Sequence, residues 1–136
     1  MKVSDLPFNR LIGIVVQDDG SVALTLGDQH MNHLGTAHAS VIFALAEATS
    51  GEWVIRNLSG ELPNALAVTR SGTIQYKKPA NNALLANVMK SSVPAADLIQ
   101  QVVTRGMGRV GLDIQVMCGG LPVAIASFEW LIQKRS

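Results

Sequence analysis

The sequence predicts an α+β domain in which an antiparallel sheet of about six strands wraps around one long central helix. The first observation is a stretch from Asn32 to Trp53 that is dominated by apolar helix formers and is long for so small a chain. The second is a set of segments with the two-residue alternation of β-strands, two before the helix and four after it. The third is that neither a βαβ alternation nor an internal repeat is present in the sequence.

Length and composition indicate one domain, residues 1–136, because a chain of 136 residues buries one ordinary core. With a formal charge of +1 and 15 % charged residues, the chain lacks the strong positive electrostatic potential that attracts nucleic acid. The sequence has neither a signal-peptide pattern nor an apolar window that reaches the ~20 residues of a membrane span. Cys118 is the single cysteine, which excludes an intrachain disulfide. We therefore expect a cytoplasmic protein without nucleic-acid partners.

The first half of the chain predicts a hairpin, a loop and the central helix. Two β-rich segments, 11–16 and 22–26, flank Asp19-Gly20, a strong turn signal. Residues 27–38 lack periodicity and predict a loop. The helix should begin between His38 and Ser40 and end near Leu58, before a Ser-Gly pair and a proline.

The second half predicts four more strands and one short helix. Strands are expected over residues 65–78, 84–89, 108–118 and 121–132, with Gly119-Gly120 as the turn of the last hairpin. Residues 94–104 could form a short helix or continue a strand, and we favour the short helix. In the strand over 65–78, alternation places Leu66, Val68, Ile74 and Tyr76 on one face and Thr69 on the other. In the strand over 108–118, the side chains expected to point inward are Val110, Leu112, Ile114 and Val116.

Glu47 is the chemically unusual residue of the central helix, because every other residue from Val41 to Ala48 is apolar. Removing a carboxylate from water costs several kcal/mol or raises its pKa, so the residue needs either a structural partner or a chemical use. Ser50 and Gly51 follow three and four positions later, on the same helical face, and would leave space beside the carboxylate. Val41, Leu45, Trp53 and Val54 would suit an apolar tunnel but would equally fill a core.

The amino end of the helix offers a second chemical group. The first N–H groups of a helix have no intrahelical acceptor and lie at the positive end of its dipole, so the Ala39 N–H suits a developing oxyanion. Glu47 lies eight residues away, about 12 Å along the axis, which is too far for both groups to serve one carbonyl. Two chains packed with their helices antiparallel would bring Glu47 of one chain near Asn32, His38 and Ala39 of the other.

These features resemble the hot-dog-fold acyl-CoA thioesterases, in particular the branch of the phenylacetate-degradation and 4-hydroxybenzoyl-CoA enzymes. The resemblance covers nearly the whole chain and includes Tyr76-Lys77-Lys78-Pro79-Ala80, which matches a Tyr-x-x-Pro-Ala pattern. Its sharpest part is residues 32–51, where an Asn or Gln precedes a His-Gly-Gly helix start and an acid follows inside the helix. Two positions differ from the family pattern: Ala39-Ser40 replaces Gly-Gly, and Gly51 stands where several members carry Ser or Thr.

The resemblance implies a homodimer or a dimer of dimers that hydrolyses an acyl-CoA or acyl-carrier thioester without metal or cofactor. It assigns catalytic roles to five residues: Asn32, His38, Ala39, Glu47 and Thr69. Glu47 would act either as a general base on water or as a nucleophile that forms a mixed anhydride, and the sequence does not separate the two. The residues placed nearest the substrate are Ser40 and Gly51, and the lysines Lys77 and Lys78 are candidates for the coenzyme A phosphates, although scattered cations often only face solvent.

Two alternative functions remain. A hydratase or dehydratase of the same fold pairs a His with an acid 14 residues later, a spacing that His33 and Glu47 share, but the His-Phe-Pro-Gly element of those enzymes is missing. A non-catalytic acyl-binding or interaction module is the other alternative. His30, His33 and His38 match no standard metal site, and Ser40 and Ser50 lack the context of a hydrolase nucleophile.

Overall fold

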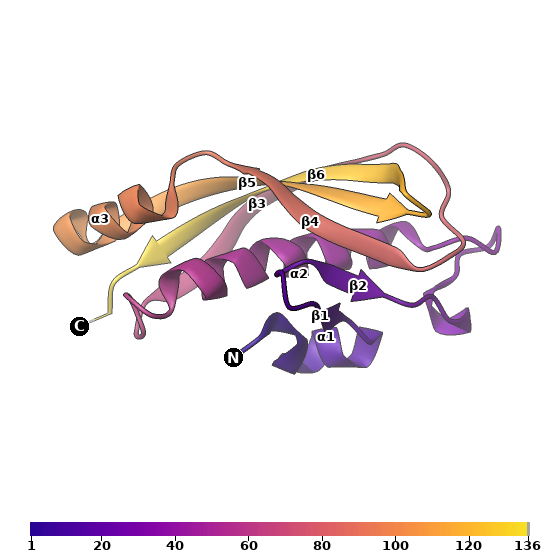
Figure 1. Cartoon of the computed structure of the whole chain (residues 1–136), viewed down its shortest axis with the longest axis horizontal. Helices are drawn as coiled ribbons and strands as arrows, with labels where there is room; N and C mark the ends of the chain where they lie inside the picture. The colour runs from indigo at the N-terminus through magenta and orange to yellow at the C-terminus, as the bar shows by residue number, and fades with distance from the viewer. Residues whose placement is uncertain (136) are drawn as a thin grey trace.

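The computed structural model describes residues 1–135 (Figure 1). The helices are η1 (Val3–Asp5), α1 (Pro7–Ile12), η2 (Asp28–His30), α2 (Ala39–Leu58) and α3 (Ala95–Arg105), and the strands are β1 (Val15–Val16), β2 (Val22–Leu24), β3 (Leu66–Tyr76), β4 (Leu84–Ser91), β5 (Met107–Cys118) and β6 (Leu121–Gln133). None of the described helices is long and apolar enough to cross a membrane.

The described strands form one antiparallel sheet of six strands in the order β1-β2-β4-β5-β6-β3. The sheet curls over α2, which runs along its inner side, and the N-terminal segment lies on the opposite side of the helix (Figure 1). The expected α+β architecture is therefore confirmed. The strand at one edge, β3, is bonded along its length only to β6 within the described chain.

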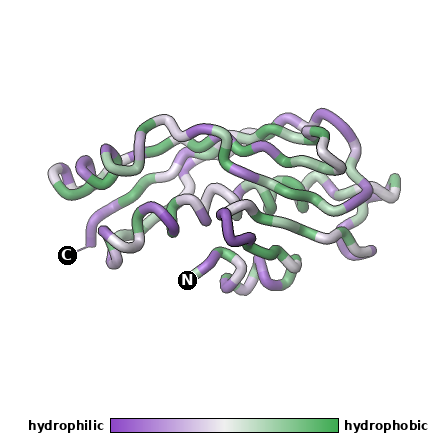
Figure 2. Tube along the Cα trace, in the orientation of Figure 1, coloured by the Kyte–Doolittle hydropathy of each residue, from purple (hydrophilic) through white to green (hydrophobic). Residues whose placement is uncertain are grey.

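The core lies between the sheet and α2. Val110, Leu112, Ile114 and Val116 of β5 are all buried, as their alternation predicted. They meet Leu45 and its neighbours on the helix, which are fully buried as well. Hydrophilic stretches of the chain concentrate at its termini and in several connections between elements (Figure 2). Because burial of apolar area is the main favourable term in folding, this shared core fixes the helix on the sheet.

The prediction of a strand over residues 11–16 is wrong for its first part. Pro7 starts the short helix α1, and Gly13 ends it with φ +93°, a left-handed conformation that glycine adopts without strain. Only Val15 and Val16 pair with β2. Leu11 consequently points into solvent from a helix, with 80 % of its surface exposed.

The prediction that Leu66, Val68, Ile74 and Tyr76 share one face of β3 is also wrong. The pairing of β3 with β6 shifts between Thr69 and Ser71, which is the signature of a β-bulge. The extra residue, Arg70, reverses the alternation. Thr69 lies opposite Trp130 and Ile74 opposite Ala126, so these β3 residues share the inner face with the core of β6, whereas Val68 lies opposite Leu131 on the outer face.

The other predicted helices and strands are present, although the strand expected over residues 22–26 ends at Leu24. Residues 94–104 were expected to form a short helix, and α3 covers Ala95–Arg105 with Leu98 and Val102 buried. The last two strands form the expected hairpin, in which Gly119 and Gly120 take the positive φ values of +57° and +79° at the turn.

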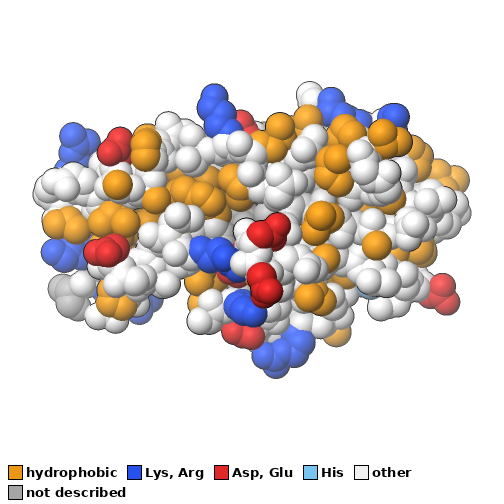
Figure 3. All heavy atoms as spheres, in the orientation of Figure 1, with side chains coloured by type: hydrophobic (Ala, Val, Ile, Leu, Met, Phe, Trp, Pro, Cys, Tyr) orange, Lys and Arg blue, Asp and Glu red, His pale blue; other side chains and the backbone are white. Residues whose placement is uncertain are grey.

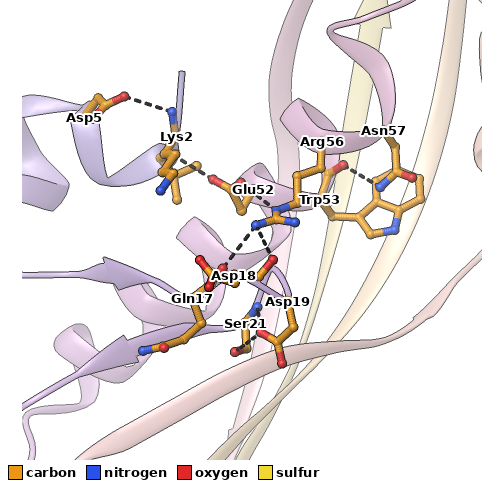
Figure 4. Close-up of polar contacts among 11 residues, drawn as sticks. Lys2, Asp5, Gln17, Asp18, Asp19, Ser21, Glu52, Trp53, Arg56 and Asn57 are labelled. Atoms are coloured by element: carbon orange, nitrogen blue, oxygen red, sulfur yellow. Dashed lines mark hydrogen bonds and ion pairs between the residues drawn. The ribbon is translucent and has the colours of Figure 1, made fainter.

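A buried carboxylate, Glu52, ties the N-terminal segment to α2 (Figure 4). One carboxylate oxygen accepts the backbone N–H of Val3 at 2.9 Å, and the other accepts Nε of Arg56 at 3.1 Å. The same guanidinium donates to the carbonyl oxygens of Gln17 and Asp18 in the turn before β2, both at 3.1 Å. Charged side chains of both signs gather near this point in the middle of the visible surface (Figure 3). Three segments far apart in the sequence are thus joined through Glu52 and Arg56.

We predict that Glu52→Ala lowers the free energy of unfolding by about 2 kcal/mol, because it leaves a buried N–H without an acceptor and Arg56 without its partner. The value is at the low end for a buried pair because 40 % of the Arg56 side chain is exposed. Urea denaturation would measure it. Glu61→Ala, at an exposed position after α2, is the matched control, and equal effects of the two substitutions would contradict the structural role of Glu52.

Candidate active site

Glu47 lies on the face of α2 that looks toward β3 and β6, and its carboxyl group is partly withdrawn from water. Burial raises the pKa of Glu47 above its ordinary value of 4.5, and hydrogen bonding from the Thr69 side chain lowers it by a smaller amount. The bulge in β3 matters here, because it determines which β3 side chains face the helix. The structure therefore brings together two of the predicted site residues, Glu47 and Thr69.

An apolar cavity of about 480 Å³ extends from Glu47 along α2. The helix contributes Glu47, Ala48, Gly51, Val54, Ile55 and Leu58 to its lining. The N-terminal segment and the inner faces of β3 and β6 supply other parts of the wall. Among the suggested tunnel residues only Val54 contributes, because Leu45 is in the core and Trp53 lines a separate polar hollow beside Arg56.

The expectation that Ser50 leaves space beside Glu47 is wrong. Ser50 is fully buried, its hydroxyl donates to the Glu47 carbonyl oxygen at 2.6 Å, and it accepts the indole N–H of Trp130 at 2.9 Å. Its role is to fix the indole against the helix. Gly51 is among the residues that line the cavity, and Val3 and Trp130 pack closely against it: a methyl group placed on Gly51 would lie 3.2 Å from Cγ1 of Val3 and 3.5 Å from Cζ2 of Trp130.

At the amino end of α2, His38 caps the helix. Its Nδ1 accepts the Ser40 N–H at 3.0 Å, so the neutral ring carries its proton on Nε2. The N–H of Ala39 is at the first helical position, where no intrahelical acceptor exists. His38, Ala39 and Ser40 are all exposed in the single chain. This end of the helix therefore presents an N–H group and an imidazole to an incoming molecule.

Asn32 holds the loop that precedes the helix. Its side-chain oxygen accepts the N–H groups of Leu34 and Thr36 at 2.9 and 3.1 Å, and its amide nitrogen donates to the Thr36 hydroxyl at 2.9 Å. These contacts are those of a turn residue, and they account for much of its hydrogen-bonding capacity. His33 is exposed in the same turn and does not contribute to the cavity at Glu47.

The end of β3 lies beside the amino end of α2. The Tyr76 hydroxyl donates to the Ala39 carbonyl oxygen at 3.0 Å, and burial raises the pKa of Tyr76. Lys77 and Lys78 follow directly, with both backbone N–H groups directed to the Val123 carbonyl oxygen and both side chains in solvent. These lysines are therefore on the same side of the molecule as the Ala39 N–H.

A single chain does not unite the predicted groups. Asn32, His38, Ala39 and Ser40 gather at the start of α2, whereas Glu47 and Thr69 lie about 12 Å further along the helix axis. Within residues 1–135, His, Cys, Asp and Glu side chains form no cluster that could hold a metal ion. His30 has a structural role, since its Nδ1 accepts the Gly27 N–H at 2.8 Å and its Nε2 bonds to the Ile12 carbonyl oxygen.

Sequence reasoning missed Glu52 and Trp130. Glu52 precedes Arg56 by four positions, a spacing typical of ion pairs on one helix face, and that signal was available. Trp130 belongs to the inward-facing set of β6 and lines the cavity. Its contact with Ser50 spans 80 positions of sequence, so no local pattern could have indicated it.

Comparisons with known proteins agree with this architecture. The model of a family described as a domain of unknown function (DUF4442) matches residues 7–127. No curated protein matches the chain. A Pseudomonas aeruginosa protein of unknown function, described as a probable thioesterase, is similar with a TM-score of 0.85 and 16% identity over 98% of this chain and 91% of that one.

Two further solved structures are similar. A Bacillus halodurans protein solved with CoA has a TM-score of 0.70 and 25% identity, over 92% of this chain and 74% of that one. A Staphylococcus aureus protein described as a thioesterase enzyme has a TM-score of 0.71 and 12% identity, over 94% of this chain and 99% of that one. These similarities establish the hot-dog fold.

We predict that Glu47→Gln stabilises the protein increasingly as the pH rises. Since the pKa of Glu47 is higher in the folded chain, the folded state binds more protons than the unfolded state between pH 4.5 and that folded pKa. The free energy of unfolding of the natural chain therefore decreases as the pH rises through this window. The Gln variant has no group that titrates at this position, so its stability shows no such decrease.

Urea denaturation of both proteins at pH 4, 5.5 and 7 would measure the difference. Glu61→Gln, at an exposed position, should show no comparable trend. If the natural chain instead became more stable than Glu47→Gln as the pH rises, burial would not be what raises the pKa of the Glu47 carboxyl group.

Proposed function

We propose that this chain, which belongs to the DUF4442 family, hydrolyses acyl-CoA thioesters at a site formed by two copies of the chain. The observation that carries the proposal is Glu47, a carboxyl group with a raised pKa at the mouth of an apolar cavity. Perturbed acids in apolar cavities are candidates for catalytic function. The fold shared with a described thioesterase enzyme and with a CoA-bound protein supports the substrate class.

The Ala39 N–H stabilises the negative charge on the thioester oxygen in this proposal. The charge develops at the positive end of the α2 dipole, where a fixed N–H needs no reorganisation during the reaction. Asn32 and His38 hold the loop and the cap that position this N–H. Ala39 needs only its backbone for this role, so the replacement of the family's Gly-Gly by Ala39-Ser40 is compatible with it.

Glu47 acts as the general base. It removes a proton from a water molecule, whose oxygen attacks the thioester carbonyl carbon; the C–S bond then breaks and the coenzyme A thiolate takes up a proton. A raised pKa makes the carboxylate a stronger base than an exposed Glu, and the Thr69 side chain, which lowers the pKa by a smaller amount, lies beside it.

Two chains are needed because Ala39 and Glu47 are about 12 Å apart in one chain. The long edge strand β3 supports pairing with a second copy, since unpaired strand edges readily add another strand. Leu66, Val68 and Tyr76 on this strand are exposed apolar side chains, with 38 %, 38 % and 48 % of their surfaces accessible. An antiparallel pair of β3 strands places the two α2 helices side by side in opposite directions.

The coenzyme A moiety extends from the Ala39 side of the site in this arrangement. Lys77 and Lys78 are exposed where β3 ends beside Ala39, and they would bind the phosphates of the coenzyme A leaving group. Ser40, at the amino end of α2, is assigned to the pantetheine arm, and Gly51, in the lining of the cavity, is assigned to the acyl side of the site.

We predict that Glu47→Gln lowers turnover of acyl-CoA by at least about a hundredfold, the scale expected for loss of a general base. Release of free thiol from a panel of acyl-CoAs is the measurement, beside an assay for enoyl-CoA hydration. Glu61→Gln is the control for loss of one carboxylate elsewhere. If Glu47→Gln turns over acyl-CoA as fast as the natural chain, Glu47 is not the general base. If the natural chain hydrates enoyl-CoA but releases no thiol, the hydratase or dehydratase alternative is favoured.

A mixture of two inactive variants tests the two-chain site. Asn32→Ala and Glu47→Gln should each be nearly inactive as homodimers, because each lacks one half of both sites. Random exchange makes half of the dimers mixed, and each mixed dimer has one intact site. We therefore expect about a quarter of natural activity per total site, if the two sites act independently.

Native mass spectrometry would confirm that mixed dimers form. Recovery near zero in a sample that contains them would show that one chain supplies every group.

A further inference from the structure

The backbone N–H of Ala39 is the open donor at the start of α2. The two N–H groups before it have backbone acceptors. Ala37 donates to the Ala80 carbonyl oxygen at 2.7 Å, and His38 donates to the His30 carbonyl oxygen at 2.8 Å. The Ala39 N–H occupies the first helical position, and the described chain contains no acceptor bonded to it. The segment that leads into the helix is therefore fixed, while this one donor stays available to a ligand.

The next peptide unit, between Ala39 and Ser40, is held at both of its ends. Its N–H donates to Nδ1 of His38 at 3.0 Å, and its carbonyl oxygen accepts the hydroxyl of Tyr76 at 3.0 Å. Because a peptide unit is planar, bonds at its two ends leave it little freedom to rotate. This unit shares the Cα atom of Ala39 with the unit that carries the Ala39 N–H. Holding the first unit therefore limits the directions in which that N–H points.

The bulge in β3 brings Tyr76 to the helix. Tyr76 lies opposite Ala124 of β6, which is fully buried, so its side chain starts from the inner face of the sheet. Thr69 lies seven positions earlier, and regular alternation would place residues seven apart on opposite faces. The bulge between Thr69 and Ser71 removes this difference. One strand thus directs Thr69 to the middle of α2 and Tyr76 to its amino end.

We propose that Tyr76 is a positioning residue of the thioester site, whose hydroxyl holds the Ala39–Ser40 peptide unit so that the Ala39 N–H points at the developing oxyanion. The inference rests on the proposed thioester hydrolysis and adds a residue to it. Tyr76 acts through the backbone and does not touch the reacting atoms. Its contribution is directional, since a hydrogen bond weakens steeply with misalignment and a donor that is already aligned needs no reorganisation.

The first experiment compares Tyr76→Phe with the natural chain on the acyl-CoA of the panel that is hydrolysed fastest. Removal of the hydroxyl should lower kcat about tenfold, the scale of one lost hydrogen bond, and change KM less than about twofold, because the oxyanion exists only in the transition state. Thr104→Val is the matched control. It also removes a hydroxyl that donates to a helical carbonyl oxygen, that of Gln100 at 2.8 Å, but on α3, and it should keep the natural kcat.

Equal kcat values for Tyr76→Phe and Thr104→Val would overturn the inference. Light scattering on the same samples checks a second explanation, because Tyr76 lies on the strand that is proposed to pair with a second copy. If the loss of kcat in Tyr76→Phe is accompanied by dissociation of the dimer, the residue serves the interface and its positioning role is wrong.

Amide hydrogen exchange, followed by NMR without substrate, separates this inference from the proposed hydrolysis. In Tyr76→Phe the Ser40 N–H should exchange at least about threefold faster than in the natural chain, whereas that of Leu45, in the middle of α2, should be unchanged. Natural exchange at Ser40, or an equal increase at Leu45, would overturn the inference.

The two experiments together distinguish the two failures. If the natural chain hydrolyses acyl-CoA but Tyr76→Phe keeps the natural kcat, the hydrolase function stands and the positioning role of Tyr76 falls. If the natural chain releases no thiol from any acyl-CoA, the hydrolase function falls, and the exchange at Ser40 alone shows whether Tyr76 holds the start of α2.

Discussion

Desolvation of carboxylates on an apolar helix is the constraint that organises this molecule. Helix α2 carries Glu47 and Glu52 between the sheet and the N-terminal segment, and each must be compensated or accept a changed pKa. Glu52 receives a backbone N–H and a guanidinium N–H, so its charge is fully paired. Glu47 receives only the weaker influence of Thr69, and its pKa rises. Two acids five positions apart thus differ: Glu52 has a structural role, and Glu47 is the acid to which we assign a chemical role.

The pairing of Glu52 also shapes the environment of Glu47. Because Glu52 fixes the backbone of Val3, the N-terminal segment stays against α2 and forms one side of the apolar cavity. Trp130, which is held by Ser50, forms the other side. An acid beside an apolar cavity keeps a raised pKa, and in the proposed reaction Glu47 would act as a base on a substrate whose acyl part lies in the same cavity. The stability of the fold and the proposed chemistry would therefore depend on the same contacts.

In the proposed reaction, the two ends of α2 suit different parts of the substrate. The amino end offers fixed N–H dipoles and, through β3, the neighbouring lysines, which suit a polar and anionic leaving group. The middle and carboxyl end offer a base and aliphatic walls, which suit an acyl chain. A straight helix separates these environments within one chain, and an antiparallel second copy would bring them together. In the proposed arrangement, the two-fold symmetry of a dimer would bring together groups that one chain holds about 12 Å apart.

Local sequence patterns determined much of this structure. The run of apolar helix formers in α2, the alternation of β5 and β6 and the paired glycines between them predicted the central helix, the inner face of the sheet and its last hairpin. These features depend on neighbours within a few residues. The same reasoning singled out Glu47. It placed residues 11–16 in a strand because apolar composition outweighed the Pro7 and Gly13 signals of a short helix.

Tertiary structure alone decided the rest. The bulge at Arg70 turned Thr69 and Ile74 toward the same face, and no period in the sequence marks it, because it depends on how β3 pairs with β6. Likewise, sequence reasoning singled out Glu47 but not Glu52, and it did not indicate which acid of the helix would be paired. Arg56 is a local partner of Glu52, but Val3 and Thr69 reach the two carboxylates only in the folded chain, and the free energy of a buried charge is set by its nearest polar groups in space.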